Sequence, residues 1–91
     1  MYNSEEIEQI VNFGVFEYDS AKIANILKKD IKEVEKELIQ KKSEMSILMQ
    51  TGRDMSDYVI DLKLFELAKS GDMKALEKLE ERKRQRLRKK T

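Results

Sequence analysis

Few side chains in this sequence could carry out chemistry, and the most suggestive are three aspartates. Asp54, Asp57 and Asp61 share one helix face at spacings i, i+3 and i+7, a pattern that could hold a metal ion or an acid and base pair. The chain has no His and no Cys, which excludes imidazole ligands, histidine bases, thiolate metal sites and disulfides. Glycine-rich phosphate loops are also absent. We therefore expect a solvated aspartate face and no catalytic residue, metal site or cofactor.

The second chemical feature is a run of positive charge at the C-terminal end. All 18 acidic residues lie at or before Glu81, so residues 1–81 carry 12 basic and 18 acidic side chains, a net charge of −6, and residues 82–91 carry +7. Such a segment can release counterions from a nucleic acid and bind it without sequence preference. It could equally be a solvated end or a contact for an acidic protein. Its cations are Arg82, Lys83, Arg84, Arg86, Arg88, Lys89 and Lys90.

The elements that position these charges are helices. The 91 residues are 41% charged and 40% hydrophobic, with no Pro and only three Gly, a composition typical of one all-α domain. The N-terminus has no signal-peptide pattern, and no apolar run is long enough for a membrane span. We expect a cytoplasmic protein, in the host cell cytoplasm if the protein is viral, with no membrane partner and no small-molecule substrate.

Caps and glycines divide the chain into helices. We expect helix starts at Asn3 or Ser4, Asp19 or Ser20, Asp30 (in a capping pair with Glu33), Asp54 and Asp72. Glycine readily takes the left-handed conformation that ends a helix, so we expect ends near Asn12–Gly14, Thr51–Gly52 and Ser70–Gly71. The last connection is short enough to make its two helices an antiparallel hairpin.

The segment from Ala24 to Leu38, ANILKKDIKEVEKEL, has the spacing of a helix-turn-helix. Ala24 is the small residue where two helices cross, and Leu27 and Val34 are the expected core pair. Lys28 stands where glycine is usual, at a cost of about 1 kcal/mol if the turn is left-handed. The outward side of the second helix mixes lysines with glutamates, and carboxylates oppose phosphate binding. DNA contact and a purely structural role both remain open for this module.

The stretch from Asp54 to Ser70 is apolar on two sides when it is placed on a helix. Ile60, Leu64 and Leu67 fall on one side, together with Ala68, and a second side carries Tyr58, Leu62 and Phe65. Such a helix must bury both sides. Whether the second side is covered by the same chain or by another subunit stays open.

The order of these parts, a helix-turn-helix followed by a long apolar helix that runs into LAKSGDMKALEKL, resembles the small subunit of tailed-phage terminases. The resemblance implies a non-catalytic DNA-packaging protein that forms a homo-oligomer such as a ring, recognises phage DNA and regulates a large subunit with motor and nuclease activities. It implies DNA contacts at Lys28, Lys29, Lys32 and Lys36, with the basic end assisting. It also implies an oligomer interface in the central helix, which we assign to Ile60, Leu64 and Leu67.

On this interpretation the chain has three parts: a helix-turn-helix-like module (1–52), a central helical hairpin for oligomerisation (53–81) and a basic arm (82–91). Two alternatives remain open. One is a helix-turn-helix regulator of transcription, which binds paired half-sites as a two-fold dimer. The other is a helical virion or assembly protein that binds no DNA and docks its basic arm on an acidic partner.

Overall fold

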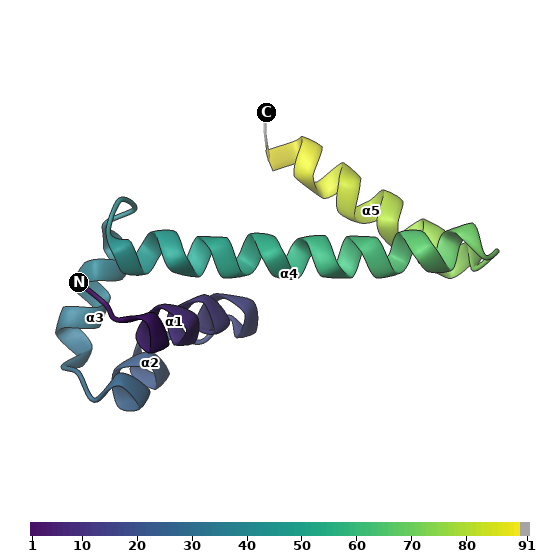
Figure 1. Ribbon diagram of the computed structural model, residues 1–91. Coiled ribbons are helices and arrows are strands. Elements are labelled where there is room, and N and C mark those ends of the chain that lie inside the picture. The colour runs from purple at the N-terminus through teal and green to yellow at the C-terminus, as the bar shows by residue number, and fades with distance from the viewer. Residues whose placement is uncertain (90–91) are drawn as a thin grey trace. The chain divides into compact units, whose positions relative to one another are not determined.

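The computed structural model describes residues 1–89 of the chain (Figure 1). Its helices are α1 (Ser4–Phe16), α2 (Ser20–Leu27), α3 (Ile31–Ile39), α4 (Glu44–Lys69) and α5 (Met73–Lys89). No strand occurs among these described residues, so the all-α prediction is confirmed. None of the helices combines the length and the hydropathy needed to cross a bilayer.

Side-chain caps begin four of the helices close to the predicted positions. Asn3 accepts a hydrogen bond from the N–H of Glu6 at 2.8 Å, and the Glu6 carboxylate accepts one from the N–H of Asn3 at 3.1 Å. Asp30 accepts from the N–H of Lys32, so a simple cap replaces the predicted pair with Glu33. Caps of this kind contribute about 1 kcal/mol each. The remaining two are formed by Asp19 and Asp72.

Two glycines that were predicted to end helices lie inside them instead. α1 continues past Gly14 to Phe16, and α4 runs through Gly52 without a break, so both predicted helix ends are wrong. A Cβ atom at Gly14 would lie 2.1 Å from the carbonyl oxygen of Met49, and one at Gly52 would lie 2.0 Å from the carbonyl oxygen of Val11. These glycines are therefore needed for the close approach of the α1 and α4 backbones, which is the other main use of a residue without a side chain.

The chain divides into two compact units, and the first, Met1–Ser56, holds the hydrophobic core. Each of its helices contributes at least one fully buried side chain, so α1, α2, α3 and the first part of α4 form a single packed body. The largest of these side chains are Ile10, Ile23, Val34, Met45 and Met49.

Tyr2 fastens the N-terminus to this body. Its hydroxyl donates a hydrogen bond to the Glu37 carboxylate of α3, and its backbone N–H donates to Glu44 of α4 at 3.1 Å. Burial of the phenol, together with the neighbouring Glu37, raises the pKa of Tyr2 far above its usual value. The phenol therefore remains a neutral hydrogen-bond donor.

The second unit begins at Asp57 and contains the rest of α4 together with α5. The connection between the two helices turns at Gly71, whose φ of +103° is in the left-handed region, as predicted for this position. Ala75 is the one buried side chain among the described residues of this unit. The unit thus has far less core than the first.

Candidate nucleic-acid interface

The contact between α2 and α3 is built by the residues that the sequence pattern singled out. Ala24 and Val34 are buried, and Leu27 packs against the same core. Lys28 has a φ of 56°, in the left-handed region, and the N–H of Lys29 donates to the carbonyl oxygen of Ala24 at 2.9 Å. The chain accepts the strain of a left-handed lysine at this turn, at a cost of about 1 kcal/mol.

The lysines of this turn are exposed and gather with a residue that the sequence analysis did not select. A shallow groove of about 740 Å³ is lined by residues of α2 and of the turn, including Lys28, Lys29, Asn25 and Lys22. The Nζ atom of Lys22 lies 4.6 Å from the ring centroid of Tyr18, in a cation–π contact. Lys22 and Asn25, three residues apart, lie on one side of α2, and Lys28 follows at its C-cap, a pattern that could have identified Lys22.

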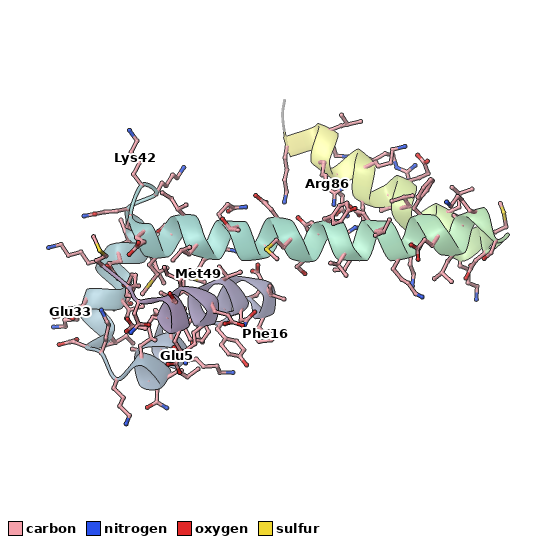
Figure 2. All side chains as sticks on the ribbon, in the orientation of Figure 1. Glu5, Phe16, Glu33, Lys42, Met49 and Arg86 are labelled. Carbon is pink, nitrogen blue, oxygen red and sulfur yellow. The ribbon has the colours of Figure 1, made fainter. Side chains whose placement is uncertain are left out.

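The outer face of α3 carries both signs of charge. Val34 points into the core, and Lys32 and Lys36, each two residues away from it, fall on the opposite side of the helix and are exposed. Glu33 and Glu35 flank this lysine pair and are also exposed, as Figure 2 shows for Glu33. The predicted lysines thus lie in the middle of the face, between carboxylates that would repel a phosphate backbone.

The basic residues from Arg82 to Lys89 are helical, and two of them are bound to α4. Arg82 donates from Nε to Asp61 at 2.7 Å and from Nη2 to Asp57 at 3.1 Å. The Nη2 atom of Arg86 lies 2.6 Å from the second carboxylate oxygen of Asp61. In Figure 2, Arg86 lies on the side of α5 that faces α4. These four side chains are hereafter called the arginine clamp.

The clamp corrects the prediction of a solvated aspartate face. Asp57 and Asp61 are partners of arginines, whereas Asp54 accepts from Gln50 on its own helix at 3.0 Å. Within residues 1–89 no acidic group forms a metal-binding cluster. The signal was present in the sequence, because Asp61 lies ten residues before Gly71 and Arg82 eleven residues after it, so an antiparallel turn brings them together.

The other basic residues of α5 have looser partners. Lys83 pairs with Glu80 at 3.3 Å and Arg84 with Glu81 at 2.8 Å, both within α5 and both well exposed. The Arg84 guanidinium lowers the pKa of Glu81. Arg88 and Lys89 also lie on the exposed part of α5, and Lys90 is outside the described residues. The predicted projecting arm is therefore helical as far as Lys89.

The two apolar sides of α4 in the second unit are exposed to different degrees in the single chain. Leu64 and Leu67 are half-buried, and Ile60 is 42% exposed. The other side of α4 is the more open one, since Tyr58 is 65% and Phe65 49% exposed. α5 adds further exposed apolar side chains at Met73, Leu76 and Leu87.

The arginine clamp should make stability depend on pH in the acid range. Burial acts to raise the pKa of Asp61, but the hydrogen bonds from Arg82 and Arg86 outweigh it and hold the pKa below its ordinary value of 3.8. Because the folded-state pKa is depressed, the contribution of Asp61 is present at neutral pH and is lost as the pH falls below that value.

We expect Asp61→Asn to lower the free energy of unfolding by up to about 1 kcal/mol at pH 7, since ion pairs that remain partly exposed are weak. The difference from the wild type should shrink as the pH falls below 3.8, as followed by urea unfolding at several pH values. A difference that does not shrink on acidification would show that Asp61 acts through packing and not through its charge.

Comparison of the chain with protein-family models, curated proteins and solved structures gives no match to any of the three.

Proposed function

We propose that this protein is a non-catalytic DNA-binding protein that self-associates, of the kind represented by terminase small subunits. The observation that carries the proposal is the α2–α3 contact, with Ala24 and Val34 buried, Asp30 capping α3, and lysines exposed around the turn. This combination supports a helix-turn-helix, in which the second helix approaches the major groove and the turn lies near phosphates.

The charge distribution favours an approach through the turn and the lysine pair of α3. Lys22, Lys28 and Lys29 line one groove, and Lys32 and Lys36 continue the positive charge along α3. Glu33 and Glu35 flank that pair and weaken its attraction for DNA. Phosphate contacts supply affinity without reading sequence, so moderate and salt-dependent binding is expected.

Self-association is supported by the poor core of the second unit. Two helices with a single buried side chain cannot be stable on their apolar contacts alone. The α4–α5 hairpin (residues 57–89) exposes Tyr58, Leu62 and Phe65 at a spacing of four and three residues, which is the spacing of a helix-packing seam. A second copy of the same hairpin would complete a four-helix bundle. Such an assembly is compatible with the proposed role, in which the subunits regulate a partner protein that has motor and nuclease activities.

A second candidate function is that of a helical protein-interaction subunit without DNA binding. It is favoured by an open groove of about 840 Å³ in the first unit, whose apolar lining includes Leu38, Ile39, Ile47 and Met49. The internal pairing of the arginines on α5 also favours it, because paired side chains are less available to DNA. A dimeric regulator of transcription remains the third possibility, distinguished by two-fold binding to paired half-sites.

Fluorescence anisotropy with a labelled duplex of about 30 base pairs separates these functions. We expect the wild type to bind with a steep salt dependence, and Lys28→Gln/Lys32→Gln to weaken binding roughly tenfold or more at low salt, because two phosphate contacts are lost. The matched control is Lys41→Gln/Lys42→Gln, which removes the same charge from the connection between α3 and α4 (Figure 2). Equal losses in the two variants would rule out the turn as the DNA-binding surface, and no binding of the wild type would favour the interaction subunit.

A further inference from the structure

The arginine clamp differs from the other ion pairs of α5 in where its partners lie. Lys83 and Arg84 pair with carboxylates of their own helix three residues away, which leaves both cations on the surface. Arg82 and Arg86 pair with carboxylates of α4. The clamp arginines are therefore held toward the neighbouring helix.

The central pair of the clamp is the most enclosed ion pair of the second unit. The side chains of Asp61 and Arg82 are 24% and 28% exposed, whereas the outer members Arg86 and Asp57 are 42% and 54% exposed and Arg84 is 57% exposed. Asp61 accepts a hydrogen bond from Arg82 on one oxygen and forms an ion pair with Arg86 through the other, and these arginines lower its pKa. Ion pairs with good geometry and several members hold better than single surface pairs.

We infer that Asp57 and Asp61 act as internal counter-ions that hold Arg82 and Arg86 against α4 and so withhold two positive charges from DNA. The inference rests on the proposed DNA-binding function. Of the basic residues from 82 to 89, the clamp removes two from competition for phosphate, and the more exposed cations of α5 add to the attraction of the turn and α3 lysines. A phosphate backbone must displace both carboxylates before it gains these arginines, so the clamp sets an upper limit on non-specific affinity.

The test compares two variants that change the net charge equally. Asp57→Asn/Asp61→Asn removes the clamp acids, and Glu66→Gln/Glu77→Gln removes two exposed acids of the same unit that do not contact the arginines. We expect the clamp variant to bind the 30-base-pair duplex about five- to tenfold more tightly than the control variant at about 50 mM salt. Its plot of log affinity against log salt should be steeper by one to two, because each arginine freed for a phosphate adds about 0.9 to the slope.

If circular dichroism shows that the clamp variant loses helix content, a second pair of variants tests whether the clamp withholds its arginines from DNA. Arg82→Gln/Arg86→Gln should change the wild-type affinity less than twofold, because those arginines are already withheld. Lys83→Gln/Lys89→Gln, with the same change of charge, should weaken binding several-fold.

The outcomes that would overturn the inference differ from those that would overturn the proposed function. Suppose that the wild type binds DNA but the clamp variant binds it no more tightly than the Glu66→Gln/Glu77→Gln control. The clamp then does not restrain binding, and the same conclusion holds if Arg82→Gln/Arg86→Gln and Lys83→Gln/Lys89→Gln weaken binding equally. If neither the wild type nor any variant binds the duplex at low salt, the DNA-binding function itself is wrong, and the inference falls with it.

Discussion

Gly52→Ala should destabilise the protein by about 2–3 kcal/mol, although alanine is the better helix former. In an exposed helix interior the same change stabilises by roughly 0.5–1 kcal/mol. Here the new Cβ would lie 2.0 Å from the carbonyl oxygen of Val11 and 3.0 Å from the backbone nitrogen of Val15. Backbone atoms cannot rotate away as a side chain can, so α1 and α4 must separate and lose packing around the core.

Two control substitutions isolate this effect, with the free energy of unfolding measured by denaturant titration and circular dichroism. Thr51→Ala, on the exposed side of α4, should change the stability by less than about 0.5 kcal/mol. Gly71→Ala should cost about 1 kcal/mol from its left-handed φ alone, because a Cβ there has no atom within 4 Å. If Gly52→Ala proves as stable as Thr51→Ala, α1 does not approach α4 as closely as described.

Leu62→Glu/Phe65→Glu should convert the proposed assembly to a monomer, with the association weakened at least a hundredfold. Both side chains are exposed in the single chain, so their replacement should leave the fold of the monomer intact. Burying each of them between copies would contribute about 1.5–3 kcal/mol, and the substitution would instead bury carboxylates without partners. Native mass spectrometry across a range of protein concentrations measures the change directly.

The control for this experiment is Lys63→Gln/Lys78→Gln, which lowers the net charge by the same amount at exposed polar positions of the two helices. It should keep the mass of the wild-type assembly. A wild type that is monomeric at every concentration would contradict self-association and would leave the apolar side of the α4–α5 hairpin without a second copy. An assembly that survives Leu62→Glu/Phe65→Glu but not a change at Ile60 would instead support the interface assigned from the sequence.

Much of the fold follows from local chemistry and could be predicted from the sequence. A chain without proline and rich in helix formers forms helices, and Asn3, Asp19 and Asp30 cap them because their short side chains reach the unpaired N–H groups of the first turn. Ala24 and Val34 were predicted to be buried from their spacing alone. Helix caps and the burial of one helix side depend on residues only a few positions apart in the chain, so both can be predicted from the sequence.

The roles of the glycines and the aspartates were decided only by the tertiary structure. Glycine serves both for a left-handed turn and for close backbone approach, and the sequence around Gly14 and Gly52 does not distinguish the two uses. Gly71 is in a turn, whereas Gly14 and Gly52 lie where two helices touch. For Asp57 and Asp61, the spacing about Gly71 indicated that α5 could reach them, but only the packed hairpin shows that its arginines face their side of α4. Contacts between distant segments depend on how helices pack, and local sequence preferences do not encode that packing residue by residue.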